Sequence, residues 1–126
     1  VTFTHENTDI SYSPSLIASN AFLYRFGQGL EFELSTKYVG KQFLDNTSNE
    51  ARKLPAYSFS NLRIAYDWDP SFIGNVKLTA MVNNIFDAKY SSNGYTYSYL
   101  AGDLITENFV YPQAGINFML GLNVAF

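Results

Sequence analysis

Apolar and polar residues alternate along five segments of this chain with a period of two. The alternation is clear in residues 30–43, where two sets interleave: Leu30, Phe32, Leu34, Thr36 and Tyr38 against Glu31, Glu33, Ser35 and Lys37. Successive side chains of a β-strand point to opposite faces, so this period indicates strands with one apolar and one polar face. The pattern predicts strands near residues 15–26, 30–43, 57–68, 76–86 and 113–126.

The last of these segments has the longest regular series. Its apolar set alternates with smaller or polar residues: Ile116, Phe118, Leu120, Leu122, Val124 and Phe126 against Asn117, Met119, Gly121, Asn123 and Ala125. We expect one strand here, closing the wall of a barrel. In residues 76–86 the pattern slips at Asn83 and Asn84, which favours a β-bulge.

The connections between these segments alternate in length. Residues 27–29 and 69–75 form short, glycine-containing turns, whereas residues 44–56 and 87–112 are long and rich in Asn, Ser, Gly and Tyr. Tight periplasmic turns and long extracellular loops alternate in this way in outer-membrane barrels. We expect residues 1–14 to form another extracellular loop, and parts of 87–112 to extend the flanking strands.

Strand length and face chemistry favour a membrane barrel over a soluble β-sandwich. Strands of about ten residues are long enough to cross a bilayer at a tilt, and they exceed the usual length in soluble sheets. The polar residues of the alternating segments suit a water-filled lumen. Aromatic residues lie beside the short turns and the chain end, where a barrel has its interfacial girdle: Phe22, Tyr24, Phe26, Tyr66, Trp68 and Phe126. The predicted fold class is therefore an all-β, antiparallel transmembrane β-barrel.

Five strands are too few for a single-chain barrel, which uses an even number from about eight upward. An open edge in hydrocarbon would leave backbone N–H and C=O groups without partners. The first and last strands therefore need partners from elsewhere. We expect either a fragment of a larger chain or one contributor to a multi-chain barrel.

Composition excludes several classes of function. No apolar run approaches the roughly 18 residues of a membrane helix, and the net charge of −3 without a Lys/Arg cluster argues against nucleic-acid binding. Cysteine is absent, which removes disulfides and thiolate chemistry. The chain begins at Val1 without a signal-peptide pattern, so we expect a processed or partial sequence.

The sequence predicts neither an enzyme, a cofactor nor a metal site. His5 is the only histidine, so no Ser–His–Asp triad can be assembled, and its spacing to Glu6 and Asp9 fits no standard metal site. Glu31 and Glu33 could be read as a carboxylate pair, but charges balanced within a lumen explain them better. The sequence from Asp45 to Thr47 favours an Asx turn over a cation site.

Three blocks of sequence resemble the C-terminal part of a TonB-dependent outer-membrane receptor of the Bacteroidota type. They read DISYSPS at residues 9–15, KYVGKQFLDNT at 37–47 and VNNIFDAKY at 82–90, and YPQAGINFMLGLNVAF at 111–126 resembles the closing strand of that family. The resemblance implies a barrel of about 22 strands around an N-terminal plug that these residues do not include. It implies uptake of a scarce nutrient, with a siderophore, haem or cobalamin favoured.

The resemblance also implies a location and partners. The protein would span the outer membrane of a Gram-negative cell and contact lipid, its own plug, TonB through the N-terminal part, and the barrel-assembly machinery during insertion. A surface lipoprotein is a further candidate partner. The other hypotheses are a multi-chain structural or secretory barrel and a soluble β-rich binding module.

Three sets of residues are the candidate sites. The tyrosine-rich loop is the candidate for substrate contact, because tyrosine offers a large amphipathic surface: Tyr95, Tyr97 and Tyr99. The candidate contacts to the lumen or plug are Arg63, Lys77 and Asn117. The candidate assembly signal, which the family resemblance implies, consists of Phe118, Leu120, Leu122, Val124 and Phe126.

Overall fold

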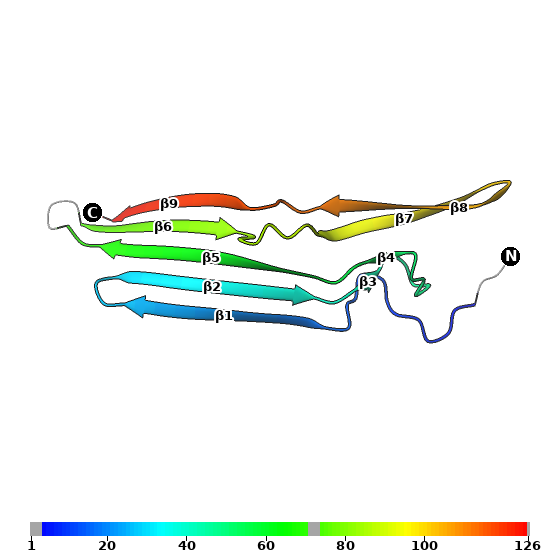
Figure 1. The fold of residues 1–126 in the computed structure, drawn as a ribbon, viewed down its shortest axis with the longest axis horizontal. Helices are drawn as coiled ribbons and strands as arrows, with labels where there is room; N and C mark the ends of the chain where they lie inside the picture. Colours follow the sequence, from blue (N-terminus) through cyan, green and yellow to red (C-terminus); the bar gives the residue numbers. More distant parts are fainter. Residues whose placement is uncertain (1–3, 71–73, 126) are drawn as a thin grey trace. The chain divides into compact units, whose positions relative to one another are not determined.

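The computed structural model describes residues 4–70 and 74–125 as an all-β chain (Figure 1). Its strands are β1 (Ile17–Phe26), β2 (Leu30–Val39), β3 (Gln42–Phe43), β4 (Lys53–Leu54), β5 (Tyr57–Trp68), β6 (Asn75–Asn83), β7 (Ser91–Ala101), β8 (Asp103–Pro112) and β9 (Asn117–Ala125). No stretch of the described chain forms a helix that is both long and apolar enough to cross a membrane.

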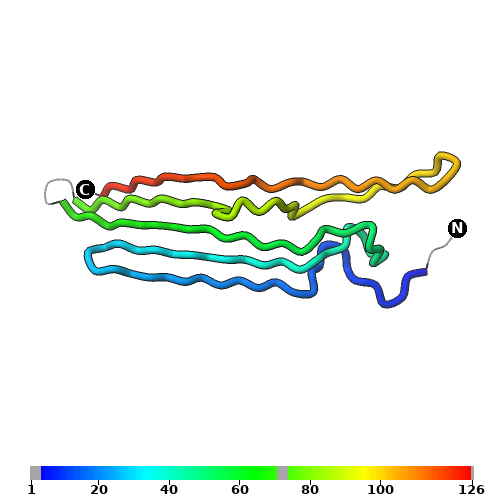
Figure 2. Tube along the Cα trace, in the orientation of Figure 1, coloured from blue at the N-terminus to red at the C-terminus, as the bar shows by residue number. Residues whose placement is uncertain are grey.

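The chain divides into two compact units. The first, which we call the sheet unit, comprises Ala18–Lys37, Ser58–Ala88 and Ala114–Phe126; the second, the loop unit, comprises Val1–Ile17, Tyr38–Tyr57 and Lys89–Gln113. The sheet unit contains one five-stranded sheet in the order β1-β2-β5-β6-β9. Neighbouring strands of this sheet run antiparallel and side by side along the trace (Figures 1 and 2).

The turn between β1 and β2 requires glycine at its third position. Gly29 has a φ of 81°, and its carbonyl accepts the amide of Asp67 at 2.9 Å. A Cβ at this position would lie 2.4 Å from the carbonyl oxygen of Asp67. Gly29 therefore keeps the end of β5 close to the tight turn that the sequence predicts.

The predicted bulge at Asn83 and Asn84 is instead the end of a strand. β6 stops at Asn83, and Asn84 and Asp87 both take a φ of 51°, in the left-handed region. Left-handed residues cannot continue a strand, and asparagine and aspartate adopt this region more readily than other side chains do. The slip in the alternation therefore marks a turn that leads out of the sheet.

The loop unit contains two small sheets, β3-β4 and the β7-β8 hairpin. A continuous strand over residues 30–43 is therefore a wrong expectation: β2 ends at Val39, and β3 pairs with β4 in a separate sheet. The amide of Gly40 donates to Leu16 O at 2.8 Å instead of continuing the ladder of β2. Residues 87–112 are no open loop either, because β7 and β8 pair over nearly their whole length.

The last strand is shorter than the predicted range 113–126. Gln113 belongs to the base of the hairpin, where its amide donates to Tyr90 O at 2.9 Å, and the amide of Ile116 donates to Asp87 Oδ1 at 3.0 Å. These bonds hold residues 113–116 outside the sheet, so β9 begins at Asn117. Phe126 and the central residues of the predicted turn 69–75 lie outside the described residues. Residues 4–14 contain no strand.

Each unit buries few apolar side chains. Leu54, Leu44, Phe43 and Val39 form the centre of the loop unit. In the sheet unit the buried apolar side chains are Ala65 and Val76, while most of its large apolar residues are exposed to solvent. A soluble sheet would bury such residues under a second layer, because exposed apolar area costs free energy. The sheet unit therefore has an apolar surface that needs an apolar environment.

Candidate functional site

The register of β5, β6 and β9 gives this part of the sheet one apolar face and one face with most of the polar residues. Facing residues on β5, β6 and β9 form four apolar rows: Leu62–Val82–Phe118, Ile64–Ala80–Leu120, Tyr66–Leu78–Leu122 and Trp68–Val76–Val124. Paired residues of an antiparallel ladder share a face. Leu120 is 88% exposed and Phe118 71% exposed, so this apolar face is open along β9, whereas Val76 in the fourth row is buried.

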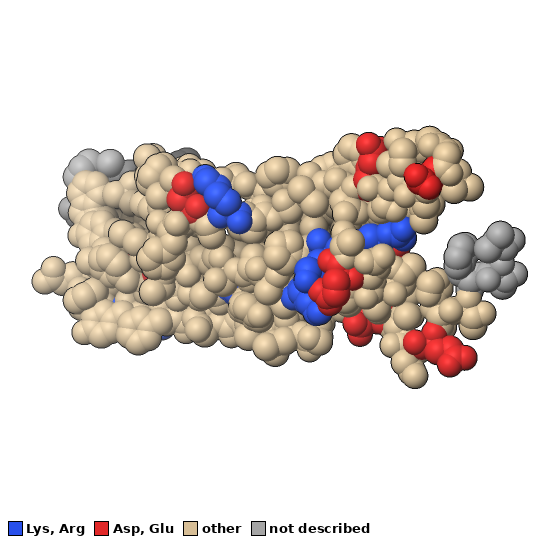
Figure 3. Space-filling view, turned by 45° about the vertical axis from the view of Figure 1, so that its right-hand side comes forward, with Lys and Arg blue, Asp and Glu red and all other residues tan. Residues whose placement is uncertain are grey.

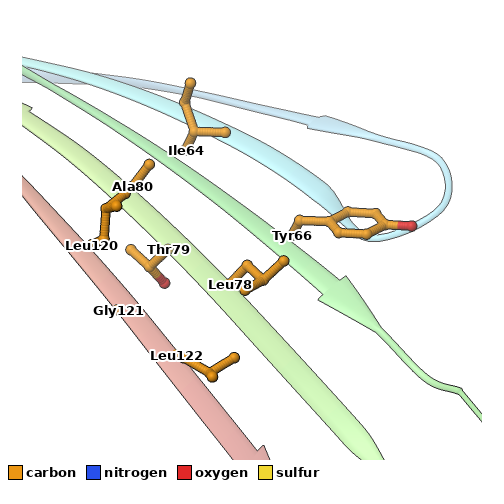
Figure 4. Close-up of a pocket in the computed structure, with 8 residues that line it drawn as sticks. All are labelled: Ile64, Tyr66, Leu78, Thr79, Ala80, Leu120, Gly121 and Leu122. Atoms are coloured by element: carbon orange, nitrogen blue, oxygen red, sulfur yellow. The ribbon is translucent and has the colours of Figure 1, made fainter.

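A shallow hollow lies in this apolar face. Figure 4 shows the side chains of Ile64, Leu78 and Leu120 around the short side chain of Ala80. Alanine leaves space between the bulkier residues of neighbouring strands. Four residues of the candidate assembly signal, Phe118, Leu120, Leu122 and Val124, lie on this face, and the fifth, Phe126, is not described.

The opposite face of the sheet is polar and linked by ion pairs across strands. Glu31 on β2 accepts hydrogen bonds from Arg25 Nε and Arg63 Nη1, each at 2.8 Å. Arg63 also lies 3.6 Å from Glu33, and Lys77 lies 3.5 Å from Asp67 on the adjacent strand. Charges of both signs are therefore balanced within this face, as the sequence suggests for Glu31 and Glu33.

The three candidate lumen residues all lie on this polar face but do not meet. Arg63 lies in a row with Met81 and Met119, and Lys77 in a row with Asp67 and Asn123. Asn117 pairs with Asn83, whose Nδ2 donates to Asn117 Oδ1 at 2.9 Å. The face is thus lined by separate polar groups over the length of the sheet rather than by one cluster.

Asn84 and Asp87 connect the ends of three chain segments. The Asn84 side chain donates to the carbonyls of Ala88 (3.0 Å) and Ala114 (3.2 Å) and accepts the amide of Ala88 at 2.9 Å. Its amide donates to Asn61 Oδ1 at 3.0 Å. Because Asn84 is 3% exposed, each of these bonds replaces one to water. These contacts give a structural reason for the Asn and Asp of the VNNIFDAKY block.

The three candidate tyrosines in the loop unit share one face of the β7-β8 hairpin. The register places Tyr95 opposite Phe109, Tyr97 opposite Glu107 and Tyr99 opposite Ile105. Tyr95 stacks on Phe109 with centroids 4.9 Å apart, and the rings of Tyr97 and Tyr99 are 5.7 Å apart. We call this surface the tyrosine face; its further members are Asn93, Ala101, Asp103 and Tyr111.

The other face of the hairpin is attached to the loop around β4. Arg52 donates through Nη1 to Asp45 at 2.8 Å and through Nη2 to Ser98 and Thr106, at 3.0 and 3.1 Å. Asn108 Nδ2 donates to the carbonyl of Ala51 at 2.7 Å. These bonds hold one face of the hairpin against the loop unit. The aromatic side chains of the tyrosine face remain largely exposed.

At its base the tyrosine face borders an open hollow of about 740 Å³. Tyr95, Tyr111 and Asn93 line it together with Tyr12 and Gln42. Tyr12 is held by a hydrogen bond from its hydroxyl to Gly94 O at 2.8 Å, and Gln42 Nε2 donates to Ser92 O at 3.5 Å. The hollow therefore combines aromatic rings with neutral polar groups, a mixture common in ligand sites.

Charged side chains of the loop unit form local pairs. Hydrogen bonds from Lys41 and Lys53 lower the pKa of Glu50 to about 2. At Asp45, burial acts to raise the pKa, but hydrogen bonds from Thr47 and Arg52 outweigh it and hold the pKa below its usual range. On the face shown in Figure 3, some acidic side chains (red) lie beside basic ones (blue), whereas other acidic side chains have no basic neighbour.

Sequence reasoning missed Arg52, Tyr12 and Gln42. Each of these residues lies in a polar stretch of sequence. Each also bonds to a partner at least 46 residues away along the chain, in the pairs Arg52–Ser98, Tyr12–Gly94 and Gln42–Ser92. The turn expected at Asp45 is present, since Thr47 N donates to Asp45 Oδ1 at 3.0 Å. Among residues 4–70 and 74–125, no three His, Asp or Glu side chains gather into a metal-binding group.

Comparison with known proteins finds relatives of this chain in sequence and in fold. No protein-family model matches the chain. Over 91 residues, or 69% of this chain, it is 33% identical to the ferrioxamine receptor of Yersinia enterocolitica. Its fold matches a crystal structure of the ferric citrate transporter FecA in the unliganded form with a TM-score of 0.67 and 22% identity, over 89% of this chain.

This chain corresponds to 12% of the ferrioxamine receptor and 17% of the FecA chain. One relative is named as a receptor and the other as a transporter, and neither name denotes an enzyme. Neither comparison supports the multi-chain barrel or the soluble module. The resemblance seen in the sequence is therefore confirmed: the chain is a segment related to the TonB-dependent outer-membrane receptors and has the antiparallel β-fold of their barrels.

Proposed function

We propose that these residues form the C-terminal part of the barrel wall and extracellular loops of an outer-membrane receptor that imports a ferric siderophore. The observation that carries this proposal is the separation of the sheet into two faces. Four unbroken apolar rows cross β5, β6 and β9, while ion pairs and asparagines occupy the other face. A barrel wall needs this pattern, because lipid contacts one face and a polar interior contacts the other.

The two faces have different partners in this proposal. The apolar rows contact outer-membrane lipid, and the polar face lines the interior, where Arg63, Lys77 and Asn117 contact water or the plug. The edges β1 and β9 pair with barrel strands from the remainder of the receptor. The plug, and the contact to TonB, belong to parts of the receptor beyond this segment.

Ferric siderophores are the favoured cargo because of the relatives' names. One relative is named for ferrioxamine and the other for ferric citrate, and both names denote small iron complexes. In the proposed receptor, the tyrosine face contacts the cargo outside the cell through Tyr95, Tyr97 and Tyr99. Aromatic side chains provide large contact area with little loss of conformational freedom.

The apolar residues of β9 have a second role in this proposal. Phe118, Leu120, Leu122 and Val124 share the apolar face of β9, which is an edge strand of the sheet, and with Phe126 they constitute the signal that the barrel-assembly machinery reads by strand pairing. If so, deleting Phe126 from the full receptor reduces its insertion into the outer membrane. Normal insertion after this deletion contradicts the assembly role and leaves the transport role untouched.

Uptake of radioactive iron by whole cells tests the transport function. The comparison is between the native bacterium, a strain lacking the complete receptor gene and a strain lacking tonB, each supplied with ferric ferrioxamine or ferric citrate under iron limitation. The proposal predicts that at least one complex is taken up and that both deletions abolish its uptake. Undiminished uptake of both complexes by the receptor-deletion strain overturns it.

A further inference from the structure

The tyrosine face carries an unbalanced negative charge. Glu107 lies directly opposite Tyr97, and Asp103 lies opposite Ala101 on the same face. Residues 91–112 contain these two acids and no lysine, arginine or histidine. Within the described residues, neither carboxylate forms an ion pair. The hairpin therefore contributes a charge of −2 to an exposed aromatic surface.

Nearby basic residues are occupied elsewhere in the loop unit. Arg52 is bound to Asp45 and to the opposite face of the hairpin. Lys41 and Lys53 both pair with Glu50. These three cations are therefore paired with Asp45 and Glu50 rather than with Glu107 or Asp103.

Aromatic rings and carboxylates on one surface favour the same kind of ligand. The face of a tyrosine ring carries negative electrostatic potential and attracts an ammonium group. Cross-strand partners lie within about 5 Å at Cβ, so a cation over the Tyr97 ring is also within reach of the Glu107 carboxylate. An anionic ligand would meet repulsion from both groups and no described cation on this face.

We propose that the tyrosine face selects a positively charged ligand: the rings of Tyr95, Tyr97 and Tyr99 bind it by stacking and cation–π contact, and Glu107 and Asp103 neutralise its charge. The hollow beside Tyr95 and Tyr111 accommodates the uncharged bulk of the ligand. This inference rests on the proposed receptor function and adds the charge class of the cargo.

A matched series of ligands tests the charge preference. The complete receptor is purified in detergent and titrated with a linear ferric trihydroxamate that has a free terminal ammonium, with its N-acetylated neutral form and with its N-succinylated anionic form. We expect affinity to fall in that order, and the preference for the ammonium form to shrink as salt rises. Equal affinities for the ammonium and acetylated forms overturn the inference.

Substitutions assign the preference to the hairpin. Glu107→Gln should weaken binding of the ammonium form about threefold, and the double change Glu107→Gln with Asp103→Asn up to about tenfold, since partly exposed ion pairs are individually weak. Binding of the acetylated form should not change. The control Glu6→Gln removes the same charge from the N-terminal segment and should leave all three affinities unchanged. A preference that survives the double change overturns the inference.

A second pair of variants separates the ring from the hydroxyl group. Tyr97→Phe keeps the aromatic face and should retain most of the preference, whereas Tyr97→Leu should reduce it. Heat-modifiable migration in gels verifies that each variant is a folded barrel. Equal binding of the three ligands by the unaltered receptor overturns the charge inference alone. If none of them binds, the proposed receptor function fails for this ligand class as well.

Discussion

At the scale of single residues, Asn84 and Asp87 explain the block that most resembles the family. Both take the left-handed conformation, and their side chains bond the backbone of residues 88, 114 and 116. The sequence indicated that the alternation fails here, but the partners lie up to 30 residues away. Their positions follow from the pairing of β6 with β9, which no local pattern encodes.

Replacing Asn84 should destabilise the barrel. Asn84→Ala removes the side-chain bonds to Ala88 and Ala114, which are partly buried, at a cost of about 1–2 kcal/mol. The temperature at which the complete receptor loses its compact migration in gels should fall. Asn123→Ala, at an exposed position of β9, serves as the control and should have little effect. Identical transition temperatures for the two variants would refute the role of Asn84.

At the scale of elements, the strands of the sheet were predictable and the loop unit was not. β5 was predicted residue for residue because Leu62, Ile64 and Tyr66 alternate with polar or small residues. The β7-β8 hairpin lacks that signal: its two faces carry tyrosines on one side and Ser98, Thr106 and Asn108 on the other, so neither is consistently apolar. Such composition is typical of turns, and the long-range bonds from Arg52 are invisible in sequence.

The Arg52 contacts should hold the hairpin to the loop around β4. Arg52→Gln removes the ion pair with Asp45 and the fork to Ser98 and Thr106. We expect faster hydrogen exchange of the β7 and β8 amides in the complete receptor, while exchange in β5 and β6 stays unchanged. The control is Lys53→Gln, which removes a cation without touching the hairpin. If Arg52→Gln leaves hydrogen exchange of the hairpin at its original rate, Arg52 does not hold the hairpin to this loop.

The contact between Arg52 and Asp45 should weaken as pH falls. The pKa of Asp45 in the folded protein lies below its ordinary value of 3.8, so the stabilisation is complete above about pH 4 and is lost as pH falls through the lowered pKa. Hairpin protection, corrected for intrinsic exchange, should therefore be constant above pH 4 and decline below it. Asp45→Asn should abolish this decline. A decline that begins well above pH 4 would point to another group.

At the scale of the whole molecule, the proposed barrel accounts for both the apolar rows and the open edges of the sheet. The apolar rows need an apolar medium, and β1 and β9 each have a single neighbour in the described sheet. Unpaired edges are not tolerated in hydrocarbon, so closure requires other strands. Alternation and strand count indicated this from the sequence. The proposed ligand surface on the hairpin could not be predicted from the sequence, because it depends on which residues of β7 and β8 pair.

The central claim is that the two faces of the sheet meet different media, and spin labelling along β9 tests it most directly. Single cysteines at positions 118–123 of the complete receptor carry a nitroxide in lipid bilayers, and collision with oxygen is compared with collision with a water-soluble nickel chelate. Positions 118, 120 and 122 should show high oxygen and low nickel accessibility, and positions 119, 121 and 123 should not share this lipid signature. A uniform response along the strand, or high nickel accessibility at Leu120, would contradict the account.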